Sequence, residues 1–378
     1  MSSTVQPRRR LRVLAVIDTI QVSGPGRQLV ASLRELAKAG VDSRVLIFHR
    51  IGRSTSPFAR FLEENGIDHV VVQESAAFDL RVLRRFKEEV VRYSPDIVQT
   101  HGYKPSACMF FVRHTGVKVK WVAFYHGATT ENWKVRIYHW LDQKLMRSAD
   151  FVVLMSRYHR VTTRIPQDRV RIVYNAVLVP DGSTDVHGFR QRDASSPVTL
   201  GVVGRLSPEK GVDVFLRACS ILKQHSLTFT AVVAGDGPQR EELTALAHSL
   251  AISDSVQFLG HCLDTDALYA KIDVLVIPSR SEGLPNVLLE GMRFRLPTAS
   301  TAVGAIPEVL TDTAAGTLCP PDDPGELARA ILEASTPAYA TNGMSAREMI
   351  LRKFSLAKRA EALKTLYGEL SGHTDSRA

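Results

Sequence analysis

Two glutamates flank a turn in residues 281–292, Ser-Glu-Gly-Leu-Pro-Asn-Val-Leu-Leu-Glu-Gly-Met. An apolar run before the turn predicts a buried parallel strand. A helix is predicted after it, with Pro285 near its first position, where a missing N–H costs nothing. Free N–H groups at a helix start bind phosphate, and Gly283 allows close backbone approach. Glu282 and Glu290 can accept hydrogen bonds from hydroxyls. The segment therefore predicts a sugar-nucleotide site, whose ligand carries both phosphates and hydroxyls.

Two cations follow the predicted strand at residues 198–203, just before another helix start. Arg205 and Lys210 suit a diphosphate, because an arginine binds two oxygens in a fork and a lysine adds a mobile charge. The alternative is a solvated turn capped by Ser207. The presence of a second phosphate-binding motif, at 281–292, favours the diphosphate interpretation over the solvated turn.

A glycine turn and two histidines follow strands of the N-terminal half. The turn at 23–26 contains Gly24, whose backbone could approach an anion, although Gly-Pro-Gly is also an ordinary turn. His126 and His101 each end a predicted strand and precede a glycine. A histidine there can exchange hydrogen bonds with a ligand hydroxyl, or it can be purely structural.

No metal or other cofactor is expected. Asp264-Thr265-Asp266 has the form of a metal-binding motif, but it precedes a helical pattern, and helix N-capping explains it. No histidine or carboxylate cluster nearby completes a hard-cation shell.

Short β-branched runs alternate with helical patterns along the chain, which is typical of parallel sheets with helices on both faces. We expect two Rossmann-like, doubly wound α/β domains that face each other across a cleft. The expected boundaries are a first domain at 1–180, a linker at 181–197, a second domain at 198–354, and a last helix at 355–378 that crosses back to the first domain. The predicted strands are 11–17, 44–48, 69–73, 96–100, 120–125, 151–155, 170–173, 198–203, 228–234, 256–258, 273–277, 297–300 and 316–318.

Composition is that of a soluble globular protein, with 378 residues, 44% hydrophobic and 23% charged. No apolar run reaches transmembrane length, and the basic N-terminus continues directly into a strand-like segment, so we expect no signal peptide. Four widely spaced cysteines without a C-x-x-C pair fit a reducing cytoplasm.

The net charge of +9 is unevenly distributed. Residues 1–175 hold 29 Lys and Arg against 15 Asp and Glu, whereas residues 176–378 hold 19 against 24. A basic N-terminal half could attract an anionic membrane or a pyrophosphate-linked acceptor, or it could serve solubility alone. No basic motif interleaved with aromatic residues is present, so nucleic acid is not an expected partner.

Seven motifs, some of them described above, follow one another along the chain. The ordered set is 23–26, His126-Gly127, 173–177, 204–211, 235–238, 279–292 and 303–308. With these motifs the chain resembles the GT-B glycosyltransferases of the retaining family 4 type, which includes bacterial enzymes of cell-envelope polysaccharides and exopolysaccharides. The resemblance implies transfer of a sugar from a nucleotide diphosphate sugar to a hydroxyl acceptor, a glycan or lipid-linked glycan, without a metal.

The resemblance also implies residue roles. Glu282 would bind hydroxyls of the transferred sugar, Glu290 the ribose, and His126 the sugar near the reacting carbon. Arg205 and Lys210 would hold the diphosphate. The complete implied donor set is Gly24, Arg205, Lys210, Glu282, Gly283, Leu284, Pro285, Asn286, Val287 and Glu290.

Two departures from the family pattern concern the N-terminal half. Gly26 stands where an acidic residue is common, and Asn175-Ala176 replaces the usual Asn-Gly; neither is expected to touch the donor site. The segment after His126 resembles exopolysaccharide-type members, so Glu131 and Trp133, together with His101, are the expected acceptor contacts. An ordinary helix-entry loop is the alternative there.

Other functions remain to be distinguished. A sugar-nucleotide epimerase or a glycosyl phosphorylase can use a related fold. A two-lobed ligand-binding protein would usually be secreted, and the expected lack of a signal peptide argues against it. A dehydrogenase is the least expected, because the sequence lacks a complete G-x-G-x-x-G motif. We expect a cytoplasmic enzyme that is peripheral on the inner face of the membrane.

Overall fold

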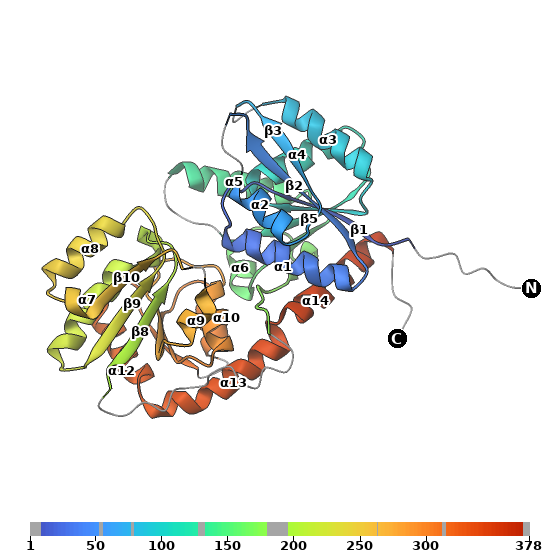
Figure 1. Cartoon of the computed structure of the whole chain (residues 1–378). Helices are drawn as coiled ribbons and strands as arrows, with labels where there is room; N and C mark the ends of the chain where they lie inside the picture. The colour runs from blue at the N-terminus through green and yellow to red at the C-terminus, as the bar shows by residue number, and fades with distance from the viewer. Residues whose placement is uncertain are drawn as a thin grey trace, which may run out of the picture.

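The computed structural model describes residues 9–52, 56–76, 79–127, 133–179, 196–262, 264–311 and 315–372. They form two α/β domains, each built on one parallel sheet (Figure 1). Glu131 lies outside the described residues, as does most of the expected linker.

The N-terminal domain contains a sheet in the order β3-β2-β1-β4-β5-β6-β7, with all described pairs parallel. Its strands are β1 (Arg12–Ile17), β2 (Asp42–Arg50), β3 (His69–Glu74), β4 (Ile97–His101), β5 (Lys120–Tyr125), β6 (Phe151–Leu154) and β7 (Val170–Ile172). Its helices are α1 (Gly24–Lys38), α2 (Pro57–Glu64), α3 (Arg81–Tyr93), α4 (Tyr103–His114), α5 (Trp133–Met146), α6 (Arg157–Thr162) and the 3-10 turn η1 (Gln167–Arg169).

The C-terminal domain repeats this plan in the order β10-β9-β8-β11-β12-β13. Its strands are β8 (Val198–Val203), β9 (Phe229–Ala234), β10 (Val256–Gly260), β11 (Val274–Ile277), β12 (Thr298–Thr301) and β13 (Gly316–Cys319). Its helices are η2 (Pro208–Lys210), α7 (Val212–Gln224), α8 (Arg240–Ser249), η3 (Ser253–Ser255), α9 (Thr265–Tyr269), α10 (Asn286–Arg293), α11 (Ile306–Leu310), α12 (Pro324–Ala334) and α13 (Pro337–Lys353). The chain ends in the helix α14 (Leu356–Ser371).

Both faces of each sheet are covered, which explains the continuous apolar runs of the strands. In β1, Val13 and Ala15 pack with α1 and α2, whereas Leu14 and Val16 pack with α3 and α4. The second sheet is covered by α7, α8 and α12 on one face and by α9, α10, α11 and α13 on the other. The predicted fold class of two doubly wound domains is confirmed.

Each sheet has one point where the strand order reverses. In the N-terminal sheet it lies between β1 and β4, and in the C-terminal sheet between β8 and β11. Loops that leave neighbouring strands there run to opposite faces and open a crevice at the carboxyl ends, where such folds bind ligands. The predicted site residues follow these strands or β5.

The last helix returns to the N-terminal domain, where α14 lies beside α1 (Figure 1). Its Leu363, Leu366 and Tyr367 are buried in the same core as β1 and α1. Backbone hydrogen bonds join Val177 to Phe354 and Leu356. The two segments that connect the domains therefore lie side by side. Among the described residues, none of the helices combines the length and apolarity needed to cross a membrane.

Candidate functional site

An ion pair occupies the crevice between β8 and β11. Lys210 at the end of η2 places its Nζ 2.7 Å from Oε1 of Glu282, which follows β11. The same oxygen accepts a 2.7 Å hydrogen bond from the hydroxyl of Ser279. The Glu282 side chain is only 8% exposed, so its charge depends on these partners.

Arg280 fixes the two loops that carry this pair. Its guanidinium binds Asp213 at 2.7 Å and Asp322 at 2.5 Å and donates to the carbonyl of Pro208 at 2.7 Å, and these contacts raise its pKa. Gly211 adopts a φ of +62°, and a Cβ atom there would lie 2.1 Å from the carbonyl oxygen of Pro278. A side chain would push the Lys210 turn away from the end of β11.

The start of α10 is open to an anion. Pro285 is the N-cap, with extended backbone angles, one residue before the first helical position near which it was predicted. It makes no side-chain capping bond, and no described group accepts from the N–H of Asn286 or Val287. Such free N–H groups, with the positive end of the helix dipole, form an anion site. Leu284 is buried, so only its backbone can face a ligand.

Glu290 lies on α10, one turn before the end of the helix, and a buried side chain fixes its carboxylate. The hydroxyl of the buried Tyr269 donates to its Oε2 at 2.7 Å. Burial and the neighbouring carboxylate raise the pKa of Tyr269 well above its usual value, so the hydroxyl stays protonated. One carboxylate oxygen of Glu290 therefore has a fixed partner, and the other forms no hydrogen bond with a described group.

The N-terminal domain contacts the start of α10 directly. Gln28 on α1 donates 3.1 Å to Oδ1 of Asn286 and 2.7 Å to the carbonyl of Ala176. A Cβ atom on Gly24 would lie 3.4 Å from the Asn286 amide nitrogen. Asn175 donates to the carbonyl of Leu284 at 3.0 Å. The expectation that Asn175 and Ala176 do not touch the donor site was therefore wrong. The segment that connects the two domains packs against the start of α10.

Three histidines gather at the carboxyl ends of β4, β5 and β6. His101 Nδ1 lies 2.8 Å from His126 Nε2, and their rings stack with centroids 5.1 Å apart. His159 is buried and contacts the hydroxyl of Ser156 through Nδ1 at 3.0 Å. A Cβ atom on Gly283 would lie 3.1 Å from the His126 carbonyl oxygen and 3.3 Å from the His159 ring. His126, through its carbonyl, and His159, through its ring, thus lie against the turn at Gly283.

Burial keeps these rings uncharged. Desolvation lowers the pKa of His126 to about 3 and that of His159 to about 4, and it holds the pKa of His101 well below its usual range. The buried cation of Arg359 acts in the same direction on His101 and His126. At neutral pH each ring has one donor and one acceptor nitrogen.

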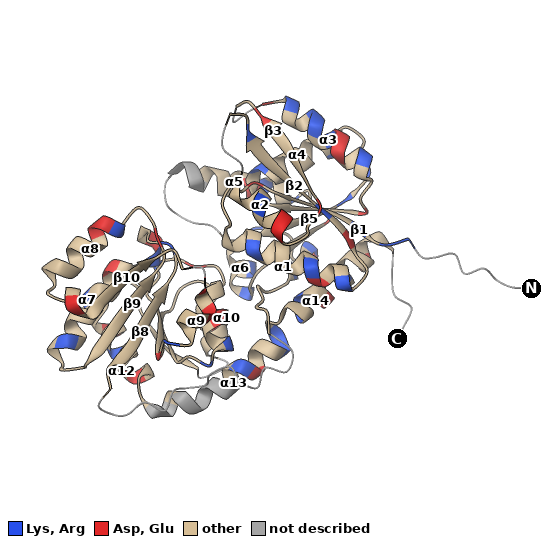
Figure 2. Ribbon diagram, in the orientation of Figure 1, with Lys and Arg blue, Asp and Glu red and all other residues tan. Residues whose placement is uncertain are grey.

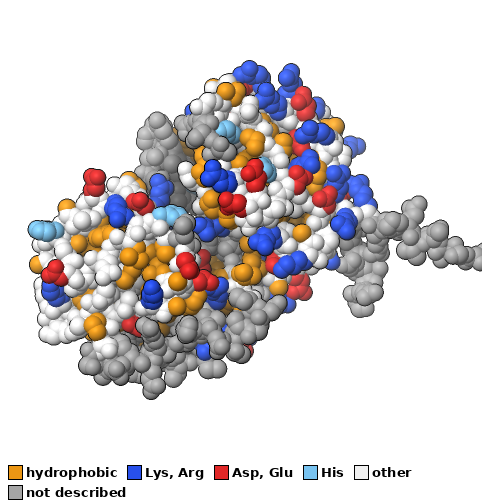
Figure 3. Space-filling view, viewed as in Figure 1, with side chains coloured by type: hydrophobic (Ala, Val, Ile, Leu, Met, Phe, Trp, Pro, Cys, Tyr) orange, Lys and Arg blue, Asp and Glu red, His pale blue; other side chains and the backbone are white. Residues whose placement is uncertain are grey.

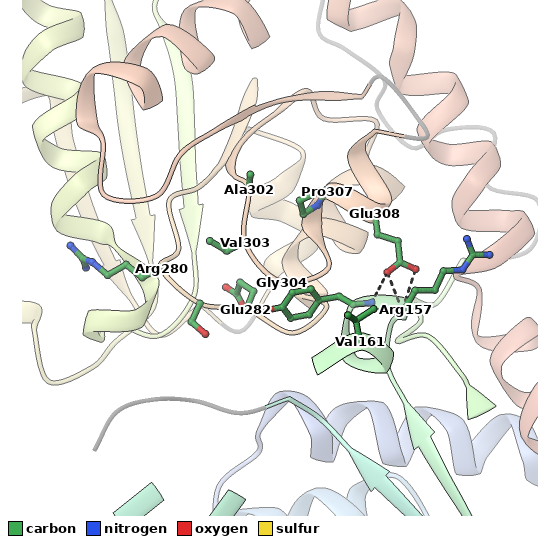
Figure 4. A pocket seen from close by; sticks show the side chains of 11 residues that line it. Arg157, Val161, Arg280, Glu282, Ala302, Val303, Gly304, Pro307 and Glu308 are labelled. Carbon is green, nitrogen blue, oxygen red and sulfur yellow. Dashed lines mark hydrogen bonds between the residues drawn. The ribbon is translucent and has the colours of Figure 1, made fainter. Parts of the chain in front are cut away.

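A cavity of about 660 Å³ opens beside Glu282, between α6 and the loops after β11 and β12. Figure 4 shows Arg157 and Val161 on one side, and Val303 and Glu308 on the other. Glu308 accepts hydrogen bonds from the backbone N–H of Arg157 at 3.0 Å and of Tyr158 at 3.3 Å. The hydroxyl of Tyr174 also donates to it, at 2.5 Å. Glu308 therefore joins the two domains at the cavity wall.

Among the described residues, no group of three or more His, Cys, Asp and Glu side chains is arranged to hold a metal ion. Asp264 is the N-cap of α9 and accepts a 3.0 Å hydrogen bond from the Ala267 N–H, which is the expected capping role.

Both domains of the chain match known glycosyltransferase families. Residues 23–176 match the family described as glycosyl transferase 4-like domain, and residues 197–336 match the family described as glycosyl transferases group 1. The lipopolysaccharide core biosynthesis mannosyltransferase LpcC of Rhizobium leguminosarum is 31% identical over 240 residues, which are 61% of this chain and 68% of LpcC. The chain belongs to the GT-B glycosyltransferases of the family 4 type.

Other similarities agree with this assignment. The α-D-kanosaminyltransferase of Streptomyces kanamyceticus is 27% identical over 61% of this chain and 63% of its own length. The crystal structure of Anabaena HepE in complex with UDP and glucose superimposes with a TM-score of 0.81, at 18% identity, over 95% of this chain and all of that one. The HepE likeness shows the shared GT-B fold.

The glycosyltransferase brings most predicted residues into one cleft. Lys210, Glu282 and the start of α10 meet at one sheet edge, and His126 and Gly24 face them. Arg205 is exposed where the chain leaves β8. Trp133 is described only as the first residue of α5.

His101 has a different place from the one expected. It is 5% exposed and packs between Phe124 and His126, so an acceptor would meet His126 first. Gln28 and His159 were not predicted from the sequence, and Glu308 was recognised only as the last residue of the motif at 303–308, without a role. Their positions after the carboxyl ends of strands β6 and β12 are the sequence signal that could have identified His159 and Glu308 as site residues.

Proposed function

We propose that this glycosyltransferase transfers a hexose-type sugar from a nucleotide diphosphate sugar to a hydroxyl of a glycan or lipid-linked glycan, with retention at the anomeric carbon. The bond between C1 and the diphosphate breaks, and a bond between C1 and the acceptor oxygen forms. The hydroxyl proton leaves with the nucleoside diphosphate. The names of relatives such as LpcC support a role in polysaccharide biosynthesis.

The observation that carries the proposal is the constellation between β8 and β11. A cation, a buried carboxylate and an uncapped helix start lie within one crevice. The cation and the free N–H groups suit the diphosphate, and the carboxylate suits sugar hydroxyls. Charge that develops on the leaving diphosphate would meet donors already in place, without reorganisation.

The remaining residues receive proposed roles from their positions. Lys210 and Glu282 form an ion pair, and we propose that a donor separates them, so that Lys210 binds phosphate and Glu282 binds the sugar. Glu290 binds the ribose with its free oxygen, and exposed Arg205 adds a second cation to the diphosphate. Gly24 and His126 contact the donor from the other domain.

Donor binding is tested by thermal stabilisation with a panel of UDP-, GDP- and ADP-linked hexoses. A ligand that binds the folded state at 100 times its dissociation constant adds about 2.7 kcal/mol of stability. Glu282→Gln should lose the preference for the sugar nucleotide over the free nucleoside diphosphate. No stabilisation by any donor, or an unchanged preference, would contradict the donor site.

The reaction class is tested by product analysis with the selected donor. A transferase releases nucleoside diphosphate faster when an acceptor is added, whereas an epimerase converts the sugar without release and a phosphorylase requires inorganic phosphate. The anomeric configuration of the product, measured by NMR coupling constants, decides between retention and inversion.

Metal independence is part of the proposal, because Lys210 and the start of α10 supply the positive potential that a metal would otherwise provide. Transfer should continue in the presence of a chelator. Complete loss of transfer that a divalent ion restores would refute this point.

We also propose that the N-terminal domain associates with anionic membranes. Figure 2 shows Lys and Arg positions along the ribbon of this domain, several of them on α3, and Figure 3 shows their side chains spread over its visible surface. On α4 and α5, the hydrophobic residues Phe111, Ile137 and Trp140 are 53%, 45% and 55% exposed. Lys144 Nζ lies 3.8 Å from the Trp140 ring centroid. An aromatic ring beside a lysine suits the interface of an anionic bilayer.

Sedimentation with anionic liposomes at low salt tests this association. Trp140→Ser should reduce binding, and Leu332→Ser, which removes an exposed leucine from the C-terminal domain, is the matched control. Failure of the wild type to sediment would contradict the proposal.

A further inference from the structure

A continuous line of hydrogen bonds runs from the last helix to the cleft. The hydroxyl of Tyr367 on α14 donates to Oε1 of Gln99 on β4. Nε2 of Gln99 lies 3.2 Å from Nε2 of His101, and Nδ1 of His101 lies 2.8 Å from Nε2 of His126. Gln99, His101 and Tyr367 are 2%, 5% and 0% exposed, so water does not compete for these bonds.

With the Gln99 amide oriented as it is in the structure, each bond in this line has one consistent direction. The Tyr367 hydroxyl donates to the Gln99 carbonyl oxygen, which leaves the Gln99 amide group to donate to His101. A neutral imidazole that accepts at Nε2 must carry its proton at Nδ1. His101 Nδ1 then donates to His126 Nε2, and the single proton of His126 is placed at Nδ1.

The groups around the line keep it neutral. Arg359 on α14 is buried, with its guanidinium bound to the Ser32 hydroxyl at 2.8 Å and to the carbonyls of Val173 and Tyr174. This cation and the neighbouring His159 oppose protonation of His126. Burial also raises the pKa of Tyr367, so the hydroxyl remains a donor.

We infer that Tyr367, Gln99 and His101 are positioning residues that hold His126 as the neutral tautomer with its proton on Nδ1. The inference deepens the proposed function, because it gives His126 one hydrogen-bond donor for the sugar or the leaving group and no positive charge. The last helix is thereby coupled to the chemistry, since its Tyr367 sets the direction of every bond in the line. No described group accepts from His126 Nδ1, which leaves this donor available to a ligand.

The tautomer can be measured without any ligand. In protein labelled with ¹⁵N at histidine, ring nitrogens that carry a proton and those that do not have clearly separate chemical shifts. The expected spectrum of the wild type shows both His126 and His101 with protonated Nδ1 and unprotonated Nε2. The pattern should not change between pH 8 and pH 5. A proton on His126 Nε2 would overturn the inference.

Two variants break the line at different points. Tyr367→Phe removes one oxygen and frees the Gln99 amide to rotate, and Gln99→Met keeps the side-chain length but removes both polar atoms. In each variant His126 should become a mixture of both tautomers. Tyr93→Phe is the matched control, because it also removes a buried tyrosine hydroxyl but lies outside the line, and it should keep the wild-type pattern.

The result is separable from the proposed function. A single Nδ1 tautomer in both Tyr367→Phe and Gln99→Met would overturn the inference whatever the enzyme transfers. If Gln99→Met does not fold, Tyr367→Phe decides alone. Failure of the donor screen would contradict the donor site and would leave the measured tautomer standing.

Discussion

Replacement of Lys210 by Met tests the ion pair between β8 and β11. The change keeps the side-chain length and removes the charge 2.7 Å from Glu282 Oε1. At an effective dielectric constant of about 20, unit charges at this distance attract by about 6 kcal/mol before desolvation is subtracted. Breaking a buried pair costs about 3–5 kcal/mol, but Lys210 is 29% exposed, so we expect a loss of about 1–3 kcal/mol.

The kinetic effect should exceed the effect on stability. If Lys210 stabilises charge on the leaving diphosphate, its loss should lower kcat by about 100-fold to 1,000-fold, as the loss of one preorganised donor does elsewhere. The assay combines kcat for the donor selected by the thermal screen with melting curves of the ligand-free protein. Addition of Glu282→Gln to Lys210→Met should recover stability, because no unpaired carboxylate remains, but should not recover kcat.

Lys223→Met is the matched control. Lys223 lies in the same domain, donates to the carbonyl of Ala251 at 2.6 Å and loses the same charge, so kcat should stay at the wild-type level. A kcat of Lys210→Met within about two-fold of wild type would refute the role of Lys210 in transition-state stabilisation. An unchanged melting temperature would refute the argument from burial.

Three further changes have defined outcomes. Glu308→Gln weakens charged hydrogen bonds to Arg157, Tyr158 and Tyr174, worth about 1 kcal/mol at this half-buried site; the radius of gyration in X-ray scattering should rise, and an unchanged value would count against the domain contact. Gly26→Ala places a Cβ atom 2.7 Å from the Phe58 ring and should cost about 1–3 kcal/mol in chemical denaturation, unlike Gly325→Ala, where the contact is an ordinary 3.4 Å. Burial raises the pKa of Asp142 to about 6, from 3.8. The folded state therefore loses stability as pH rises from about 4 to 6, and Asp142→Asn should be about 2–3 kcal/mol more stable than wild type at pH 8 but equal to it below pH 4. Equal stability of the two proteins at pH 8 would contradict this.

Most strands were predictable because they are buried on both faces. The run at 198–203 coincides with β8, and 120–125 coincides with β5. β2 is longer than the predicted 44–48, because its less apolar ends still pair with β1 and β3. The helix predicted after Glu282 is α10, with Pro285 as its N-cap, because the extended backbone angles of Pro285 exclude it from the helix itself.

For site residues on loops after strands, the sequence predicted the residue types but not the contacts between them. Glu282 and Lys210 were expected to bind different parts of one ligand, and their mutual ion pair appears only in the folded chain. Gln28 lies inside an ordinary amphipathic helix, so nothing in the sequence distinguishes it from a core-facing polar residue. Its contact with Asn286 depends on how the two domains meet.

The sequence by itself determined which chemical groups stand at the sheet edges, because parallel strands bring their carboxyl ends to one side whatever the details of packing. It therefore determined the two-domain fold class. It also determined that Glu282 and Glu290, which accept hydrogen bonds from hydroxyls, lie in a segment that can bind phosphate. Only the tertiary structure decided the state of those groups. The neutrality of His126, its proton position and its link to Tyr367 arise from burial and from contacts between residues 268 positions apart, and these exist only after α14 has returned to the N-terminal domain.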